Sequence, residues 1–571
     1  MSINQSRDEV SARTFVVAAL VLVGTAAYLR ITFANFGFFS DGDQSAIAYG
    51  VELLVRGAKG GMYNYPEQLG YYETARFLFN VFGSSLVEIR DICVAINVTA
   101  SVGLSALVLF LFPDQLTRRS RLLASGFLLV SPLLWKLSQY GNTALPSAFF
   151  VVAAFVAASR AGRVRTAVAL ACWVTALTFR ADAVLVAPAL AMWFAVRPSG
   201  SWKQGGLALA AMVAVFVALK AAVNYSTNYP SASDSLLDVM FNLTQRGRYL
   251  AHIYWGIGPV VLGFVAAGWP QIGKLLIWKC LALWVAAPFV FYFAWSTTPR
   301  YCMLLVVPAA LTAACGFDAL WRGLATSHVC IRILGRTLAL LIALAPLQFT
   351  MSDAMPGDLN DWQKPGTYQA GDGPHYYGAL LNSRSLAKAR RGLPIDAAAQ
   401  QLVAAVKEHP NQYASWIVIV DYWDDIQVSN FYLASEKSKS HAEEHDFIVK
   451  HGAMTIQFIM QRDALSSLQA SEAGRRMLAK LSGAHRVFRV LRPETKPTDK
   501  VTDLLVSGLG VKVIAEPDSN LVELKFPPLK QPKPDSRGTS KPATRPTSGP
   551  TSRAAGSNSG SERPSTRTGG R

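Results

Sequence analysis

The feature that most constrains this chain is a series of long apolar runs that extends from residue 14 to about residue 350. Each run approaches the ~20 residues that a helix needs to cross a bilayer. The composition agrees, because 51% of the residues are hydrophobic, only 16% are charged and the mean hydropathy is +0.25. The sequence therefore predicts a mainly α-helical, multi-spanning membrane protein.

We predict about eleven transmembrane helices in the first part of the chain. They lie near 14–33, 91–112, 122–140, 144–159, 166–180, 183–196, 206–224, 251–268, 275–294, 300–320 and 333–350. The runs 166–180 and 183–196 are shorter than a typical span. A cleaved signal peptide is the alternative for the first run, with Thr25-Ala26-Ala27 as its small-residue site. An uncleaved helix is preferred because the apolar run continues through Ile31 and Phe33.

Basic residues fall on alternate connections and thereby predict an orientation. With a cytoplasmic N-terminus, the inner connections carry Arg118, Arg119, Arg121, Arg160, Arg163, Arg165, Arg197, Lys203, Lys274, Arg322, Arg332 and Arg336. The outer connections near 141–143, 181–182 and 295–299 are nearly bare of Lys and Arg. The first outer loop, 34–90, and everything after about residue 350 then lie in the periplasm of a bacterium. Because much of the net charge of +18 sits in inner loops and in the tail, we expect no nucleic-acid partner.

The hydrophobicity pattern of the sequence changes after residue 350. Helical patterns at 397–406 and 466–481 alternate with strand-like runs at 416–420, 485–491 and 521–526. This alternation predicts a small extracytoplasmic α/β domain over 351–528. Residues 529–571 are rich in Ser, Thr, Pro and Gly with scattered basic residues, so we expect a disordered tail. The domains predicted are thus 1–350, 351–528 and 529–571.

Two acids in the first outer loop are the strongest catalytic candidates. Asp41 and Asp43 flank Gly42, and from Ser45 onward Ile47, Val51 and Leu54 recur at helical spacing, which predicts an amphipathic helix at the membrane surface. Acids there would face the head group of a lipid-linked substrate. Capping of that helix is an equally open alternative.

The same loop carries a second acidic and aromatic group: Glu67, Tyr71, Tyr72 and Glu73. Carboxylates suit the hydroxyls of a sugar and a tyrosine ring suits its C–H face. Aromatic anchoring at the membrane interface is the alternative.

Ionisable residues also gather at the predicted outer ends of the helices. These are Lys136, Arg180, Asp182 and Arg300. Charges beside hydrocarbon are costly and usually face a cavity or a partner. Together with the loop acids they would make a pocket with carboxylates for base chemistry and cations for a phosphate. Snorkelling and a simple Arg180–Asp182 pair are the alternatives.

Other patterns give weaker signals. His441-Ala442-Glu443-Glu444-His445 matches HxxEH, but it sits in a solvated Lys- and Ser-rich segment, so a zinc peptidase is disfavoured. Asp421, Asp424 and Asp425 are best explained as loop and helix-start acids. The six cysteines have no close CxxC pair and fit small core residues. Neither a GxxxxGK[ST] nor a GxGxxG loop is present, so no cofactor is predicted with certainty; a divalent metal stays open.

Asp43-Gln44, Tyr49-Gly50 and Leu53-Leu54-Val55-Arg56-Gly57 resemble the acidic first outer loop of the GT-C integral-membrane glycosyltransferases. Arg180-Ala181-Asp182 followed by Pro188, and Pro299-Arg300-Tyr301 followed by Pro308, are similar to segments of the same superfamily. The nearest branch resembles bacterial relatives of protein O-mannosyltransferases and lipid A aminoarabinose transferase (glycosyltransferase family 39). The likeness covers about residues 10–350.

This resemblance implies a transferase of the bacterial inner membrane that uses a polyprenyl-phosphate-linked sugar as its donor. Its acceptor would be an envelope glycan, lipid or protein, and its partners would include membrane lipids. Asp43 is then the general base of an inverting attack, Asp41 is the reserve, and Arg300, Arg180 and Lys136 contact the phosphate. Gln44 stands where the family has a second acid. A transporter of an envelope precursor and a non-catalytic assembly scaffold are the alternative functions.

Overall fold

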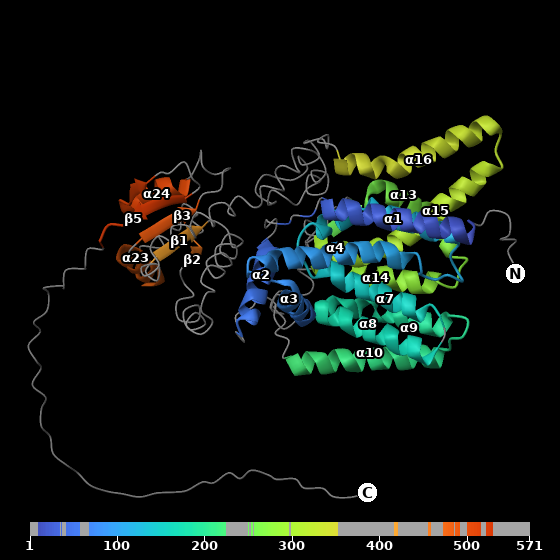
Figure 1. Cartoon of the computed structure of the whole chain (residues 1–571), viewed down its shortest axis with the longest axis horizontal. Helices are drawn as coiled ribbons and strands as arrows, with labels where there is room; N and C mark the ends of the chain where they lie inside the picture. Colours follow the sequence, from blue (N-terminus) through green and yellow to red (C-terminus); the bar gives the residue numbers. More distant parts are fainter. Residues whose placement is uncertain are drawn as a thin grey trace, which may run out of the picture. The chain divides into compact units, whose positions relative to one another are not determined.

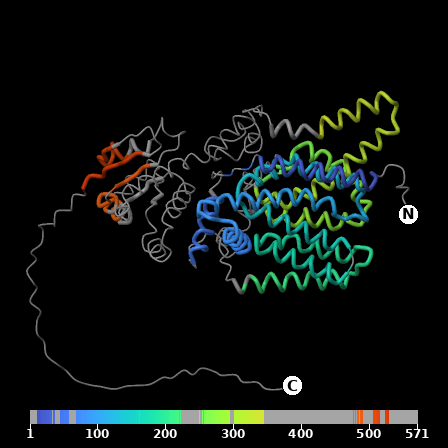
Figure 2. The backbone as a smooth tube through the Cα atoms, viewed as in Figure 1, coloured from blue at the N-terminus to red at the C-terminus, as the bar shows by residue number. Residues whose placement is uncertain are grey.

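The computed structural model describes residues 10–32, 34, 36, 42–57, 68–160, 162–223, 249–250, 253–254, 256–295, 299–351, 416–420, 455–457, 472–484, 486–490, 500–515 and 521–528. Up to residue 351 the described elements are helices, and several of them run side by side with similar directions (Figures 1 and 2). The later residues include the strands of a sheet.

The helical part begins with α1 (Ala12–Thr32), α2 (Gly42–Val55), α3 (Leu69–Phe82), α4 (Glu88–Val108), α5 (Arg118–Leu129), α6 (Pro132–Ser138), α7 (Ala144–Ala158) and α8 (Arg163–Phe179). It continues with η1 (Ala181–Val186), α9 (Ala187–Val196), α10 (Trp202–Val223), α13 (Pro259–Ile272), α14 (Trp278–Trp295), η2 (Pro299–Cys302), α15 (Met303–Ala325) and α16 (Val329–Met351). Each of the predicted apolar runs overlaps one of these helices or a consecutive pair, which confirms a mainly helical protein.

Not every one of these helices meets the criteria for crossing a bilayer alone. In the described part of the chain, four helices are long and apolar enough: Ala12–Thr32, Glu88–Val108, Trp202–Leu219 and Arg300–Ala325. A fifth span results if the bent pair α5–α6 is one crossing. The apolar helices confirm a membrane protein, while eleven crossings and their orientation stay predictions.

The bend between α5 and α6 has a local cause in the sequence. The two helices meet at 59°, and Pro132 is the first residue of α6. Proline cannot donate the backbone hydrogen bond that would continue α5, but it suits the first turn of a new helix. The hydroxyl of Ser131 then accepts a hydrogen bond from the Leu134 amide at 3.5 Å and caps α6.

The core of the helical part is centred on α15. Every residue from Met303 to Asp318 is buried, whereas α1, α10 and α16 carry many large exposed apolar side chains, such as Leu20 at 69%, Leu207 at 64% and Leu334 at 72% exposed. Apolar surface of this extent on a water-exposed protein would be unusual. On a membrane protein it is the surface that contacts lipid.

Two glycines allow α13 and α15 to cross in close contact. A Cβ added to Gly268 would clash with the Thr312 carbonyl oxygen and lie 2.8 Å from the Gly316 nitrogen. A Cβ on Gly316 would clash with the Phe264 carbonyl oxygen and lie 2.7 Å from the Gly268 nitrogen. Small residues permit this kind of backbone approach between membrane helices. This contact fixes the position of α15, which directly follows η2.

The described residues after 415 form a five-stranded mixed sheet with the order β2-β1-β3-β5-β4. Its strands are β1 (Trp416–Val420), β2 (Thr455–Gln457), β3 (Arg486–Val490), β4 (Lys512–Ala515) and β5 (Leu521–Lys525), with helices α23 (Glu472–Gly483) and α24 (Lys500–Leu509). β1 pairs in parallel with β2 and β3, while β5 pairs antiparallel with β3 and β4. The strands predicted at 416–420, 485–491 and 521–526 are confirmed.

Side chains of the sheet and its helices form a core of their own. Leu481 of α23, Leu505 of α24, Val487 of β3 and Leu524 of β5 are buried together. Arg486 bonds Glu523 through two hydrogen bonds of 2.8 and 2.7 Å and ties β3 to β5. The predicted helix at 397–406, the HxxEH segment and the tail 529–571 lie outside the described residues, so the domain bounds stay predictions.

The glycine crossing gives a stability prediction. Gly316→Ala will lower the thermal unfolding midpoint of the purified protein, because the added methyl group forces α13 and α15 apart, at a cost of about 1–3 kcal/mol. Gly263→Ala is the matched control, since Gly263 lies on α13 with no heavy atom within 4 Å of its added Cβ. Equal midpoints for the two variants would contradict the proposed close packing.

Candidate functional site

Asp182 and Arg180 form a buried ion pair at a break between helices. α8 ends at Phe179, Arg180 has an extended backbone (φ −157°, ψ 129°), and the short helix η1 begins at Ala181. The Trp173 indole donates to the Ala183 carbonyl at 3.0 Å and fixes η1 against α8. The Arg180 guanidinium contacts Asp182 Oδ2 at 3.0 Å through Nε and at 2.9 Å through Nη2. The predicted pair is therefore present.

The Asp182 carboxylate also accepts a hydrogen bond from a distant part of the chain. The Tyr292 hydroxyl of α14 donates to the same Oδ2. The side chain of Asp182 is only 8% exposed, and its Oδ1 has no hydrogen-bond partner among the described residues. A buried carboxylate oxygen without a hydrogen bond is costly, so Oδ1 is the least satisfied oxygen of this pair.

Tyr301 brings the two predicted phosphate-binding arginines to one place. Its ring stacks on Tyr292 with centroids 4.6 Å apart and planes at 30°. The guanidinium carbon of Arg180 lies 4.8 Å from the centroid of the Tyr301 ring, and that of Arg300 lies 5.6 Å from it. Residues 120 positions apart in sequence thus contact the same ring. This arrangement holds two planar cations beside a polar carboxylate, which suits a phosphate with neighbouring hydroxyls.

The helix that carries Asp43 is packed into the protein. α2 spans Gly42–Val55, as the apolar spacing predicts. Ile47 and Val51 are buried as expected, but Gln44, Ser45 and Glu52 are fully buried too, so α2 is not a simple amphipathic surface helix. Glu52 pairs with Arg56 at 2.7 Å. The backbone of Asp43 lies in the first turn of α2; its side chain and all of Asp41 lie outside the described residues.

Helix α3 links α2 to the Arg180 break. Tyr72 packs so closely on Gly50 of α2 that a Cβ there would clash with the tyrosine ring. The neighbouring Tyr71 makes an edge contact with Phe179, the residue before Arg180, with centroids 6.1 Å apart. Gly70 of α3 also lies close to Thr178 of α8. A Cβ added to Gly70 would lie 2.9 Å from the Thr178 carbonyl carbon. Through α3, the helix of Asp43 is held against the end of α8.

The two tyrosines predicted to bind a sugar are fully buried. The Tyr71 hydroxyl donates to the Cys93 carbonyl at 3.0 Å and lies 3.2 Å from Asn97 Oδ1. These contacts explain them as residues that position α3, and their binding of a sugar stays a prediction. Glu73 pairs with Arg76 at 2.7 Å on the surface, with both side chains more than a third exposed. Glu67 lies outside the described residues.

Lys136 lies on the bent helix α6, which packs against η2, the helix of Arg300. Its Nζ is 5.8 Å from the centroid of the Tyr140 ring. Asn97 donates to the Leu137 carbonyl at 3.0 Å and Asn142 donates to the same carbonyl at 2.7 Å. These hydrogen bonds satisfy a carbonyl at the end of α6 and link α6 to α4. Lys136 therefore lies on a helix that contacts η2, the helix of Arg300.

Arg30 is a buried cation that the sequence analysis missed. It lies near the end of α1 and is 2% exposed. Its Nη2 donates to the Leu128 and Leu129 carbonyls at 3.4 and 3.2 Å, and its guanidinium carbon lies 3.9 Å from the centroid of the Trp135 ring. The cation thus caps the end of α5 at the bend and supports α6. A single arginine within the apolar run 14–33 was the available signal.

The described residues contain no group of three or more His, Cys, Asp or Glu side chains that could hold a metal ion. The Asp41 and Asp43 side chains are not among those residues. All six cysteines are free thiols, and Cys93, Cys280, Cys302 and Cys315 are buried core residues as expected. Cys330 is exposed and Cys172 is partly exposed, so these two differ from the prediction.

Comparison with known proteins gives a clear result for the fold. No protein-family model and no curated protein sequence matches the chain. Among solved structures, ArnT from Cupriavidus metallidurans bound to undecaprenyl phosphate is similar, with a TM-score of 0.53, 14% identity, and coverage of 90% of this chain and 98% of ArnT. Its apo state gives a TM-score of 0.50 at the same identity and coverage.

The second similar protein is the archaeal oligosaccharyltransferase AglB from Archaeoglobus fulgidus in complex with an inhibitory peptide and a dolichol-phosphate. It has a TM-score of 0.54, 12% identity, and coverage of 86% of this chain and 71% of AglB. ArnT and AglB are GT-C glycosyltransferases. At these identities the likeness establishes a shared fold, and it confirms the fold that the sequence motifs indicate.

The Asp182 cluster gives a second stability prediction. Asp182→Asn will lower the free energy of unfolding by about 3–5 kcal/mol, because it leaves the buried Arg180 cation without its carboxylate. The measurement is chemical unfolding of the purified protein in detergent. The double variant Arg180→Gln/Asp182→Asn removes both charges and will lose less than Asp182→Asn alone. A double variant that is less stable than the single one would contradict the pairing.

Proposed function

We propose that this protein is a membrane glycosyltransferase that takes its sugar from a polyprenyl-phosphate-linked donor. The observation that carries the proposal is that Arg180 and Arg300, which are far apart in the sequence, both lie beside the ring of Tyr301. The chain also has the fold of ArnT and AglB. Those two structures contain undecaprenyl phosphate and dolichol-phosphate as bound lipids. Two arginines on a rigid aromatic support suit the phosphate of such a lipid.

The proposed acceptor is an envelope glycan, lipid or protein on the outer face of the inner membrane. Asp43 acts as general base: its carboxylate takes the proton of the acceptor hydroxyl, whose oxygen attacks the anomeric carbon with inversion. The bond from that carbon to the phosphate oxygen breaks, and the polyprenyl phosphate leaves with its negative charge. Arg180 and Arg300, with Lys136, stabilise that charge.

The packing of α2 supports Asp43 as the base rather than Asp41. Asp43 belongs to the first turn of a helix whose next residues are fully buried, and α3 joins that helix to the break that carries Arg180. A base must be held within hydrogen-bond reach of the proton that it takes. A carboxylate on an anchored helix meets this requirement better than one before the helix.

The functional test uses the purified full chain in liposomes with a panel of radiolabelled polyprenyl-phosphate sugars and a bacterial envelope extract as the acceptor source. We expect release of the free polyprenyl phosphate with at least one donor and appearance of the label in an acceptor. Accumulation of intact donor on the far side of the vesicle, without release of phosphate, would replace the proposal with a transporter. Absence of both would overturn the donor class.

The base assignment gives its own prediction. Asp43→Asn will reduce the rate of phosphate release by about 10²–10⁴-fold, the usual contribution of a general base, with an unchanged thermal unfolding midpoint. Asp91→Asn is the control, because Asp91 is a partly exposed acid paired with Arg90 at 3.3 Å on α4. Release by Asp43→Asn at the rate of wild type would exclude Asp43, and loss only in Asp41→Asn would transfer the role to Asp41.

The arginine pair gives a further prediction. Arg300→Gln will lower kcat by about 10²–10³-fold, since a preorganised donor to the leaving group is lost. Arg300→Lys will recover only part of this rate, because lysine keeps the charge but loses the planar fork. The measurement is single-turnover release of polyprenyl phosphate. Equal kcat values for wild type and Arg300→Gln would contradict a role of Arg300 at the leaving group.

A further inference from the structure

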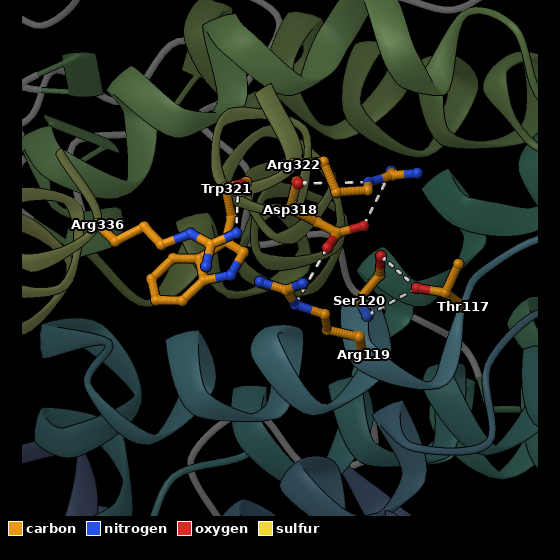
Figure 3. A network of polar contacts seen from close by, with 7 residues as sticks. All are labelled: Thr117, Arg119, Ser120, Asp318, Trp321, Arg322 and Arg336. Carbon is orange, nitrogen blue, oxygen red and sulfur yellow. Dashed lines mark hydrogen bonds and ion pairs between the residues drawn. The ribbon is translucent and has the colours of Figure 1, made fainter. Parts of the chain in front are cut away.

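A second cationic cluster lies at the other end of α15, near its connection to α16. Figure 3 shows its centre, where the Asp318 carboxylate lies between two arginines. Asp318 Oδ1 is 3.2 Å from Arg119 Nε of α5, and Oδ2 is 2.9 Å from Arg322 Nη2. The Asp318 side chain is only 4% exposed, while that of Arg322 is 54% exposed. One buried carboxylate thus faces two cations.

Two more arginines, both on α16, lack any carboxylate partner among the described residues. The Arg336 guanidinium lies over the Trp321 ring, 4.8 Å from its centroid, and Nη2 donates to the Trp321 carbonyl at 3.4 Å. Arg332, one helical turn before it, donates to the Ser327 carbonyl at 3.3 Å. The Nε atoms of both are buried without a hydrogen-bond partner in the described structure. Carbonyl oxygens orient a guanidinium but do not neutralise its charge.

The surroundings of these arginines indicate where an anion would come from. Ile331, Ile333, Leu334 and Leu338 flank them on α16 and are each more than half exposed, so this helix presents apolar surface to lipid. Trp321 beside them is typical of a membrane interface. The cluster therefore lies where the hydrocarbon of the membrane meets its head groups.

The length of α15 supports this position. The helix has 23 residues and is therefore about 35 Å long, close to the ~30 Å hydrocarbon thickness of a bilayer. η2 with Arg300 directly precedes the helix, and Asp318 and Arg322 lie in its last two turns. The two arginine groups are thus at opposite ends of one buried span, and this second group is separate from the proposed donor site.

We propose that Arg332 and Arg336 bind the phosphate of an anionic phospholipid head group at this end of the bundle. The excess positive charge attracts the anion, and the exposed apolar face of α16 packs along the acyl chains. Neutral phospholipids also carry a phosphate, but their head group adds a cation that this cluster would repel. The lipid would fasten α16 to α15 and α5.

The test measures lipid binding to the purified full chain in neutral detergent by the shift of the thermal unfolding midpoint with added lipid. We expect dioleoylphosphatidylglycerol to raise the midpoint and dioleoylphosphatidylcholine, which has the same chains, to raise it much less. Inorganic phosphate at equal concentration will not raise it. Equal shifts with both lipids would overturn the proposal, and an equal shift with inorganic phosphate would assign the site to the free ion.

The double variant Arg332→Gln/Arg336→Gln locates the site. We expect its apparent affinity for dioleoylphosphatidylglycerol to fall on the order of tenfold or more, since each interfacial cation contributes about fivefold. Arg163→Gln/Arg165→Gln is the control: it removes two exposed arginines at the start of α8 and will bind the lipid as wild type does. If both double variants lose the same lipid affinity, the effect comes from net charge alone, and this result would contradict the site. If the first double variant does not fold, Arg336→Gln alone is compared with Arg163→Gln under the same criterion.

Discussion

The arrangement of the helical part depends on the need to give every buried charge a partner where helices break inside an apolar bundle. Asp182 meets this need with Arg180 and Tyr292, while the Arg30 guanidinium is held by hydrogen bonds to the carbonyls that end α5 and by its contact with the Trp135 ring. Because an unpaired charge in such surroundings is costly, these contacts fix the breaks at Arg180 and at Pro132. The proposed chemistry is built at the first break.

The breaks also place residues from distant parts of the sequence around one point. η2 brings Tyr301 and Arg300 to the end of α8, α14 brings Tyr292, and α3 holds the helix of Asp43 against Phe179. The contacts among α2, α3 and α8 are close, because Gly50 lies against Tyr72 and Gly70 against Thr178. A rigid support of this kind is what preorganised stabilisation of a leaving phosphate requires.

Most of the helices, several of the strands and the Arg180–Asp182 pair could be predicted from the sequence. The thickness of a bilayer sets the length of apolar runs, so the helices, and the strands at 416–420 and 486–490, follow from hydropathy and β-branched content. The Arg180–Asp182 pair follows from its spacing. The partners of Arg30 and the contact of Tyr292 with Asp182 could not be predicted, because periodicity does not say which helices pack together. For the same reason, the sequence did not indicate that packing between α2, α4 and α8 buries the rings of Tyr71 and Tyr72.

The central claim is that the cations around Tyr301 bind the phosphate of a lipid-linked donor. The most direct test is an experimental structure of the full chain, in a lipid nanodisc, with a polyprenyl phosphate bound. We predict that the phosphate lies within hydrogen-bond distance of the guanidinium of Arg300 or Arg180, and that the polyprenyl chain extends toward the lipid. A phosphate bound elsewhere in the bundle, with both guanidinium groups out of its reach, would contradict the account.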